Sequence, residues 1–264
     1  MKALIKIGGT LVDDASARHS IARQIASLPG RGIAAAVVHG GGKQMTRFLE
    51  ERGIESRFVR GLRVTTEETI DAVLKVFAGS VNTQVVAALQ LAGAHAVGLT
   101  GVDSGLAVAE QLDAELGLVG NVVASDTRLL DVLTGAAYIP VIACVAGGVT
   151  GEVFNVNADS MAVAIASNWS VEQLIFLTDV AGVLDATKNI LPELAIPDCH
   201  ALITAGVATG GMQAKLNAAM DAVAAGVQEV RIVKGSDPDI VARVFAGEEC
   251  GTRIVASRAV EMTG

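Results

Sequence analysis

Two lysines that are distant in the sequence each lie close to a glycine pair. Lys6 stands in IKIGGTLVD, directly before Gly8 and Gly9, and Lys215 stands in TGGMQAK, four residues after Gly211. Glycine lets the backbone approach an anion, and helix amino termini point their N–H groups outward, so amides and an ammonium group can converge on one anion. Because an unpaired lysine is costly to bury in a strand, we expect Lys6 to meet a fixed anion.

An acidic residue that could pair with Lys6 opens the apolar helical pattern of NVNADSMAVAIAS. This residue is Asp159, close to Asn155 and Asn157. An aspartate at the start of a helix can also act only as an N-cap or a first-turn acid. The residues themselves leave both roles open for Asp159.

Short β-branched runs that end in glycine alternate with segments of helical apolar spacing. This alternation predicts an α/β fold with a parallel sheet and crossover helices, in which ligands bind beyond the carboxyl ends of the strands. The expected helices are residues 15–28, 42–51, 66–91, 158–167, 211–226 and 238–246. Residues 107–123 are expected to form a strand pair over one edge, and a change of lobe is expected near residue 170.

The composition excludes several classes of protein. Hydrophobic residues make up 51% of the 264 residues but aromatic residues only 3%, which suits helices packed on a parallel sheet. The net charge of −8 argues against a protein that binds nucleic acid or an anionic membrane. Residues 85–102 form the longest apolar stretch, but polar residues and glycines interrupt it, so we expect no membrane span.

The three cysteines, Cys144, Cys199 and Cys250, lack the spacing of a metal site, and their odd number favours reduced thiols. The sequence begins in a strand-like segment without an apolar signal core. Both features favour a cytoplasmic protein.

Two nucleotide-binding signatures are missing. The pattern G-x-x-x-x-G-K-[ST] is absent, and HGGGKQM lacks the third glycine of G-x-G-x-x-G, which disfavours a nicotinamide oxidoreductase. His39 precedes this glycine run, but no nucleophile with its own orienting acid accompanies it, so a structural role is favoured for His39.

Seven segments nevertheless occur in a familiar order. They are IKIGGTLVD, VVHGGGKQ, GLRVTTEET, NVNADSMAVAIA, FLTDVAGVL, TGGMQAK and GTRI. Together they resemble the amino acid kinase family, from residue 2 to about residue 255. Within that family, GLRVT and NVNAD resemble the members that phosphorylate N-acetyl-L-glutamate with ATP in arginine biosynthesis.

The resemblance implies a three-layer αβα sandwich with a mostly parallel open central sheet. Residues 1–170 would form an amino-terminal lobe that binds the acyl amino acid and dimerises, and residues 171–264 would form a carboxy-terminal lobe that binds ATP. It also implies a homodimer. The branch of the family that arginine inhibits typically has an additional amino-terminal helix, whereas this sequence starts directly with the first strand, so we expect no inhibition by arginine.

The resemblance also assigns site residues. Lys6 and Lys215 would stabilise the transferring phosphoryl group, and Asp159 would hold both lysines. The residues implied for the acyl amino acid are Gly41, Gly42, Arg63 and Asn155. The residues implied for the nucleotide are Gly8, Gly9, Thr178, Asp179, Gly182, Val183, Thr209 and Gly210. Mg²⁺ would be held mainly by the phosphates of ATP, without a metal site of the protein's own.

Elementary chemistry agrees with these roles. A side-chain carboxylate with a pKa near ~4.3 is ionised at neutral pH, so its attack on phosphorus needs no general base. The obstacle is the negative charge that spreads over the transferred oxygens, and cations and amides meet that demand by position and electrostatics.

One departure from the family leaves the acyl group open. Lys43 stands where the family often has proline, and the added cation could accommodate N-succinylglutamate or a carrier-linked amino acid such as aminoadipate. A non-catalytic amino acid sensor on the same fold is a further alternative, which the retention of Lys6, Asp159 and Lys215 disfavours.

Overall fold

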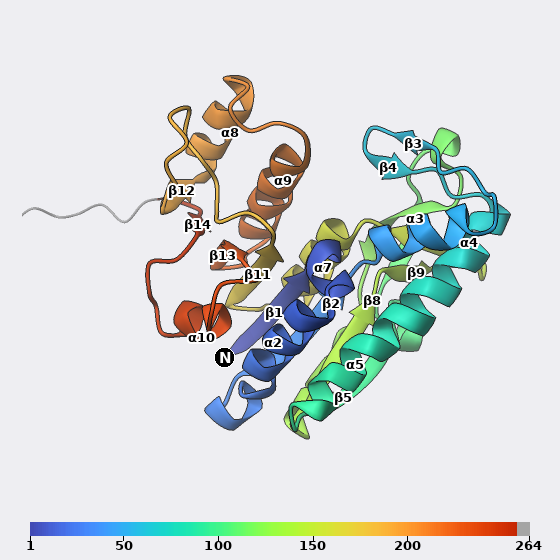
Figure 1. Ribbon diagram of the computed structural model, residues 1–264, viewed down its shortest axis with the longest axis horizontal. Coiled ribbons are helices and arrows are strands. Elements are labelled where there is room, and N and C mark those ends of the chain that lie inside the picture. Colours follow the sequence, from blue (N-terminus) through green and yellow to red (C-terminus); the bar gives the residue numbers. More distant parts are fainter. Residues whose placement is uncertain (258–264) are drawn as a thin grey trace, which may run out of the picture.

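An eight-stranded sheet forms the centre of the protein in a computed structural model that describes residues 1–257 (Figure 1). The strand order is β12-β14-β13-β11-β1-β2-β8-β5, and all neighbours are parallel except β13 and β14. In this order the strands are β12 (Glu193–Ala195), β14 (Thr252–Val255), β13 (Glu229–Lys234), β11 (Gln173–Thr178), β1 (Lys2–Ile7), β2 (Ala34–His39), β8 (Tyr138–Ala143) and β5 (His95–Thr100).

Helices cover both faces of this sheet. On one face α2, which is capped by Asp14, contacts both α5 and α10; on the other face α7 contacts α9, and α6 contacts β8. The first layer comprises α2 (Ala15–Ala26), α5 (Asn82–Leu91) and α10 (Ile240–Phe245), and the second comprises α6 (Arg128–Gly135), α7 (Ala158–Asn168) and α9 (Gly210–Ala224). The predicted three-layer αβα fold with a mostly parallel sheet is thus confirmed.

The central strands are apolar because both of their faces are covered. In β1, β2 and β11 only the first residue of each strand is partly exposed, and the other five residues are buried. Strands of this kind form near-continuous apolar runs instead of an alternating pattern. A charged residue inside such a run, as Lys6 is in β1, therefore needs a specific partner.

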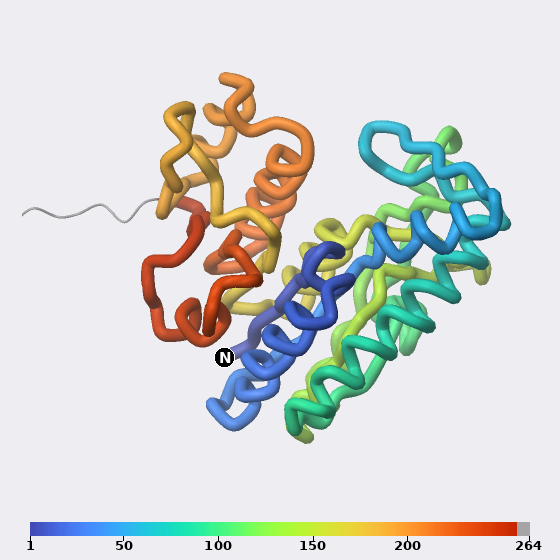
Figure 2. The backbone as a smooth tube through the Cα atoms, in the orientation of Figure 1, coloured from blue at the N-terminus to red at the C-terminus, as the bar shows by residue number. Residues whose placement is uncertain are grey.

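The order of the strands separates the chain into two halves. Strands from residue 173 onward lie on one side of β1, and β2, β8 and β5 lie on the other, as the colour change across Figure 2 shows. The remaining helices are α1 (Gly9–Asp13), α3 (Gly42–Glu50), α4 (Glu67–Val73) and α8 (Ile196–Thr204), with the short 3₁₀ segments η1 (Pro29–Arg31), η3 (Asp103–Gly105) and η4 (Ala114–Leu116). Residues 258–264 of the lobe proposed to begin at residue 171 lie outside the described residues.

A small closed barrel and a hairpin stand beside the main sheet. The barrel comprises β6 (Val108–Gln111), β7 (Val119–Ala124), β9 (Val145–Gly147) and β10 (Val153–Val156), and the hairpin comprises β3 (Phe58–Val59) and β4 (Leu62–Arg63). The strand pair expected within residues 107–123 is β6 with β7, which are antiparallel. The run YIPVIACVAGG, expected to be one strand, is divided at Cys144 into β8 and β9, because β9 leaves the main sheet to pair with β10.

One long helical stretch, Glu67–Leu91, comprises α4, the π-helical segment η2 (Leu74–Val81) and α5. Within residues 1–257 it is the one helix long and apolar enough to cross a membrane, and half of its most apolar window is buried in the protein. Core helices of globular proteins have the same properties, and α5 packs on β5 and β8.

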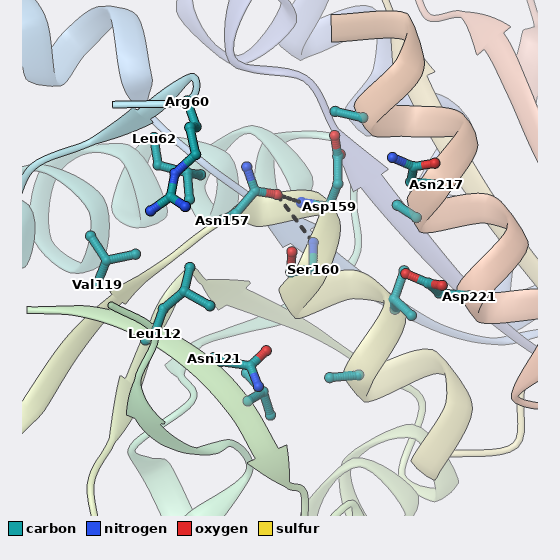
Figure 3. Close-up of a pocket in the computed structure, with 16 residues that line it drawn as sticks. Arg60, Leu62, Leu112, Val119, Asn121, Asn157, Asp159, Ser160, Asn217 and Asp221 are labelled. Carbon is teal, nitrogen blue, oxygen red and sulfur yellow. Dashed lines mark hydrogen bonds between the residues drawn. The ribbon is translucent and has the colours of Figure 1, made fainter. Parts of the chain in front are cut away.

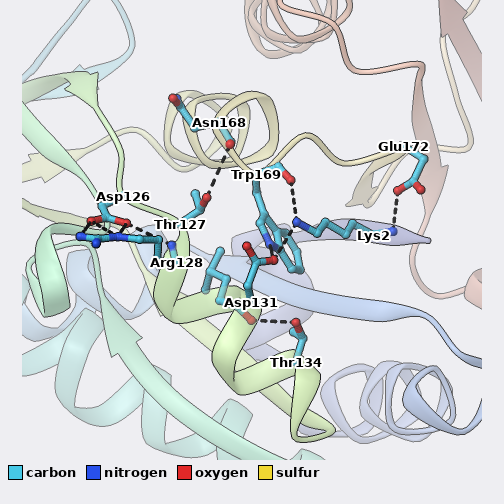
Figure 4. Close-up of polar contacts among 10 residues, drawn as sticks. Lys2, Asp126, Thr127, Arg128, Asp131, Thr134, Asn168, Trp169 and Glu172 are labelled. Atoms are coloured by element: carbon cyan, nitrogen blue, oxygen red, sulfur yellow. Dashed lines mark hydrogen bonds and ion pairs between the residues drawn. The ribbon is translucent and has the colours of Figure 1, made fainter.

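A polar network joins the start of β1 to α6 and to the end of α7 (Figure 4). The Lys2 ammonium lies 2.7 Å from Asp131 of α6 and 5.4 Å from the centre of the Trp169 ring. The same Asp131 carboxylate accepts a hydrogen bond of 2.9 Å from the indole Nε1 of Trp169. Because these residues come from β1, α6 and the end of α7, the network fixes the base of the sheet opposite the ends that carry the glycine clusters.

Candidate active site

A buried cluster of three charged side chains lies at the centre of the molecule. The ammonium nitrogen of Lys6 is 2.7 Å from Oδ1 of Asp159, and that of Lys215 is 3.4 Å from Oδ2 of the same carboxylate. The exposed fractions of the three side chains are 9% for Lys6, 12% for Asp159 and 22% for Lys215. The expected convergence of two distant lysines on one aspartate is confirmed, and their catalytic role stays a prediction.

Local structure determines where each member of the cluster lies. Lys6 pairs in register with Val38 of β2 and Phe176 of β11, so the middle of the sheet fixes its backbone. The N-cap of α7 is Asn157, whose side-chain oxygen accepts hydrogen bonds from the amides of Asp159 and Ser160. Asp159 is therefore not the cap of its helix, and its carboxylate is free to face the lysines.

Electrostatics keep Asp159 ionised. Burial by itself would raise the pKa of the Asp159 carboxyl, but the charges of Lys6 and Lys215 outweigh this effect and hold that pKa below its ordinary value. The cluster thus carries two positive charges and one negative charge, and its net charge of +1 suits it to attract an anion.

A cleft adjoins the cluster on the side of the glycine run. A cavity of about 400 Å³ is lined by Lys6, Gly9, the glycine run 40–42 and Arg63. A second cavity of about 180 Å³ shares the glycine run and Arg63 and adds Asn155. The four residues expected to bind the acyl amino acid therefore line two neighbouring cavities that share the glycine run and Arg63, and Lys6 lines the larger of the two.

Arg63 of β4 is held in this cleft by neutral groups. Its guanidinium donates hydrogen bonds to Ser56 Oγ, to Thr46 Oγ1 at 2.7 Å and to the Gly42 carbonyl at 3.4 Å, and it lies 4.6 Å from the centre of the Phe58 ring. Burial lowers the pKa of Arg63. Within residues 1–257 no carboxylate is hydrogen-bonded to this partly desolvated guanidinium, which is therefore suited to a bidentate carboxylate from outside the chain.

Asn155 of β10 is fixed by a residue that the sequence did not single out. Its side-chain amide donates a hydrogen bond of 3.0 Å to Oγ1 of Thr65, and the Thr65 carbonyl accepts one from the Leu118 amide. Gly117 makes this contact possible, because it has φ +68° and a Cβ there would lie 2.4 Å from the Thr65 carbonyl oxygen. Gly117 therefore allows its segment to lie against Thr65, which supports Asn155 and follows β4, the strand that carries Arg63.

Four of the residues expected to bind the nucleotide, Gly8, Gly9, Thr178 and Asp179, lie at the carboxyl ends of β1 and β11. The Gly8 amide donates to the Leu177 carbonyl, and a Cβ at Gly8 would lie 3.0 Å from that oxygen. Thr178 Oγ1 donates to Asp179 and accepts from the Val180 amide, while Gly9 lines the 400 Å³ cavity.

Two further parts of the expected nucleotide site come from the same half of the chain. Val183 is buried, and its amide donates to Thr252 Oγ1, against which Gly182 is packed. Thr209 is the N-cap of α9, and Gly210 opens this helix with φ +53°, a conformation that favours glycine. Lys215 also lies on α9, so this helix carries Thr209 and Gly210 at its start and one lysine of the charged cluster.

A larger cavity of about 480 Å³, which Asp159 lines, lies between α7 and α9 (Figure 3). Its walls include Asn157, Asp159 and apolar residues of both helices, and Arg60, Asn121, Asn217 and Asp221 surround it. Asp159 thus lines this cavity, while its ion-pair partner Lys6 lines the 400 Å³ cavity.

Taken together, the arrangement provides two cations fixed by one anion, glycine amides at strand ends, and an arginine cleft for a carboxylate. Such a site can hold an anionic acceptor beside a phosphate group and neutralise charge that develops between them. In addition to the predicted residues, Asn157, Thr65 and Thr46 support it; the NVNAD and GLRVT segments contained the signal for the first two.

Known proteins resemble the chain over nearly its whole length. The pattern of the amino acid kinase family matches residues 1–234. The acetylglutamate kinase of Solibacter usitatus is 58% identical over 257 residues, covering 97% of this chain and 100% of that protein. The acetylglutamate kinase of Agrobacterium fabrum is 42% identical over 265 residues, covering 96% of this chain and 90% of that protein.

Among solved structures, smu.665 from Streptococcus mutans superposes with a TM-score of 0.83 at 27% identity and covers 97% of this chain and 99% of its own. The similarity therefore includes both halves of the sheet.

Substitution of Asp159 by Asn tests the cluster. It should lower the free energy of unfolding by about 3 kcal/mol at pH 7, because it leaves the buried Lys6 ammonium without a counter-charge. Since the lowered pKa of Asp159 stabilises the fold above the unfolded-state pKa and this contribution is lost as pH falls through the folded-state value, the difference from the wild type should shrink below about pH 4.

Urea unfolding measures both effects. The matched control is Asp221→Asn on the exposed side of α9, which should change the stability by less than about 0.5 kcal/mol. Equal shifts of the urea midpoint in the two variants would contradict the importance of the cluster.

Proposed function

The chain belongs to the amino acid kinase family, and on this premise we propose that it transfers the γ-phosphoryl group of ATP to the side-chain carboxylate of N-acetyl-L-glutamate. The product is N-acetylglutamyl 5-phosphate, and the reaction is a step of arginine biosynthesis. The observation that carries this proposal is the similarity to acetylglutamate kinases over nearly the full length, combined with the Lys–Asp–Lys cluster beside a carboxylate-binding cleft.

The chemistry needs no general base. The acceptor carboxylate is already ionised at neutral pH, so one of its oxygens can attack the γ-phosphorus directly while ADP leaves. The requirement is to bring one anion to another and to neutralise charge on the transferred oxygens. Lys6 and Lys215 meet this requirement, and Asp159 limits the repulsion between them.

The acyl amino acid occupies the cleft between the glycine run and Arg63. Arg63 binds a carboxylate of the substrate, and Asn155 fixes its amino acid end. Gly41 and Gly42 donate amides to the acyl side; both stand at the start of α3, where a helix leaves its first N–H groups without acceptors in the helix. This placement directs the side-chain carboxylate of the substrate toward Lys6.

The nucleotide lies along the other half of the sheet. The triphosphate approaches Gly8, Gly9 and the amino terminus of α9, while Thr178, Asp179, Gly182, Val183, Thr209 and Gly210 form the nucleotide loops. A 15-residue helix that begins with two glycines offers exposed amides to an anion, which fits a phosphate group. Residues 1–170 are thus the acyl amino acid lobe, and residues 171–264 are the ATP lobe.

Mg²⁺ accompanies ATP in this proposal. Within residues 1–257 no three His, Cys, Asp or Glu side chains converge as a metal site. Mg²⁺ commonly keeps several waters and binds through substrate phosphates, so an ion carried mainly by the nucleotide needs no such cluster of side chains. When bound, the ion supplies further positive charge at the phosphates.

We also propose a cytoplasmic homodimer that spans no membrane. The thiols of Cys144, Cys199 and Cys250 are free and buried, which suits a reducing compartment. The helix Glu67–Leu91 leaves half of its most apolar window outside the core, with Leu91 78% exposed, and a second copy of the chain can cover such a face.

The position of Lys43 is compatible with a second class of substrate. Lys43 lines the 400 Å³ cavity beside Gly42, where its ammonium group can meet an extra carboxylate on the acyl group. N-succinylglutamate or a carrier-linked aminoadipate would use that cation, whereas an acetyl group would not.

A coupled ADP-release assay with and without hydroxylamine tests the reaction, because hydroxylamine traps an acyl phosphate as a hydroxamate. We expect ATP-dependent hydroxamate formation with N-acetyl-L-glutamate and slower turnover with N-succinylglutamate. Faster turnover of the succinyl substrate would favour the second class, and the absence of hydroxamate with any acylated amino acid would exclude a carboxylate kinase.

Substitutions at two positions separate the proposed roles. Lys215→Ala should reduce kcat by at least about 100-fold and change the KM for ATP little, since the lysine acts mainly in the transition state. Arg63→Ala should mainly raise the KM for N-acetyl-L-glutamate, and Arg63→Lys should not restore it because lysine lacks the bidentate geometry. Steady-state kinetics measures these parameters, and equal effects of both substitutions on both parameters would refute the assignment.

A further inference from the structure

A buried histidine stands directly before the glycine run of the cleft. His39 is the last residue of β2, and its side chain is fully buried. Its Nδ1 lies 2.8 Å from the carbonyl oxygen of Gly40, and its Nε2 lies 3.0 Å from the side-chain nitrogen of Asn82. The ring therefore bridges the glycine run and the first residue of α5.

The neighbours determine which ring nitrogen carries the proton. The Gly40 carbonyl can only accept, so Nδ1 must be the donor. The Asn82 nitrogen also faces the carbonyl oxygens of Val141 at 2.9 Å and Leu99 at 3.4 Å, so it is a donor and Nε2 accepts from it. Burial lowers the pKa of His39 to about 4, which keeps the ring neutral near pH 7.

The residues around His39 and Asn82 leave space for these two side chains. Asn82 follows the π-helical segment η2 directly, and π-helical turns are frequent at functional sites. Gly98 of β5 leaves room for Asn82, because a Cβ at Gly98 would lie 2.1 Å from its Oδ1. The buried amide of Asn82 thus depends on a glycine in the neighbouring strand.

The glycine run is confined from the remaining directions as well. A Cβ at Gly41 would lie 2.8 Å from the Phe77 ring of η2, and one at Gly40 would lie 3.4 Å from Ala158, the residue before Asp159. The thiol of Cys144 donates to the carbonyl of His39 itself. Packing therefore limits the position of the glycine run. The hydrogen bond from His39 Nδ1–H fixes the orientation of the peptide group that joins Gly40 to Gly41.

We propose that His39, oriented by Asn82, is a positioning residue for the acyl amino acid: it holds the Gly40 carbonyl away from the cleft so that the Gly41 amide, which belongs to the same peptide group, faces the substrate. This inference rests on the proposed function of the cleft and adds to it a residue that touches no substrate. Loss of the bond weakens the binding of the acyl amino acid and leaves the ATP site, on the other half of the sheet, unaffected.

A matched pair of substitutions isolates the bond. In His39→Asn the shorter amide can place its nitrogen where Nδ1 stands and donate to the Gly40 carbonyl, whereas in His39→Gln the longer amide can reach Asn82 but not that carbonyl. His39→Asn should keep the KM for N-acetyl-L-glutamate within about 3-fold of the wild type, and His39→Gln should raise it at least about 10-fold, with kcat and the KM for ATP little changed in both. Equal KM values for the two variants would overturn the proposal.

The wild-type protein provides a test that does not depend on the folding of a variant. NMR of protein labelled with ¹⁵N in its histidines should show His39 as a neutral Nδ1–H ring between pH 5.5 and 8, and the amide signals of Gly41 and Gly42 should shift on addition of N-acetyl-L-glutamate. An Nε2–H or doubly protonated ring would overturn the proposal, as would unshifted glycine amides. If the wild type forms no hydroxamate while the Nδ1–H ring is observed, the proposed reaction fails and the orientation of the Gly40 peptide stands.

Discussion

The rest of the site depends on one aspartate shared by two lysines. Lys6 stands in a central strand of the sheet that is buried on both faces, and Lys215 stands on α9, which packs against β13 and β14 of the same sheet. Without Asp159 the two ammonium groups would repel each other in partly desolvated surroundings. With Asp159 they form a fixed positive site, and the cleft and the glycine amides lie next to this site.

The two halves of the sheet support different parts of the site. Strands β2, β8 and β5, together with the hairpin and barrel, support the glycine run, Arg63 and Asn155. Strands β11, β13 and β14 support the loops that we assign to the nucleotide. The central strand β1 lies between the two halves, and we propose that the two substrates meet at Lys6 on this strand.

Much of this was predictable from the sequence. The alternation of apolar runs and helical spacing predicted the parallel sheet, because buried strands and crossover helices leave strong local patterns. The glycine clusters and the acid that opens α7 predicted which residues gather at the strand ends. The resemblance to a family added the connection between Lys6 and Lys215, which no local pattern could provide.

Other features arise only from contacts between distant segments. The antiparallel pairing of β13 with β14 and the departure of β9 from the main sheet depend on which partner strand is available. The bridge from His39 to Asn82 depends on the shift in helical register at η2 and on the space left by Gly98. A histidine before a glycine run predicts neither, so the sequence favoured a structural role without indicating what the ring holds.

We propose that Lys6 and Lys215 act as one unit on the transferred phosphoryl group. Single-turnover phosphoryl transfer in Lys6→Met, in Lys215→Met and in the double variant distinguishes joint from independent action. The double variant should be no more than about 10-fold slower than the slower single variant, since removing either lysine already disables the unit. A loss in the double variant equal to the product of the two single losses would show that the lysines act independently and would refute their joint role.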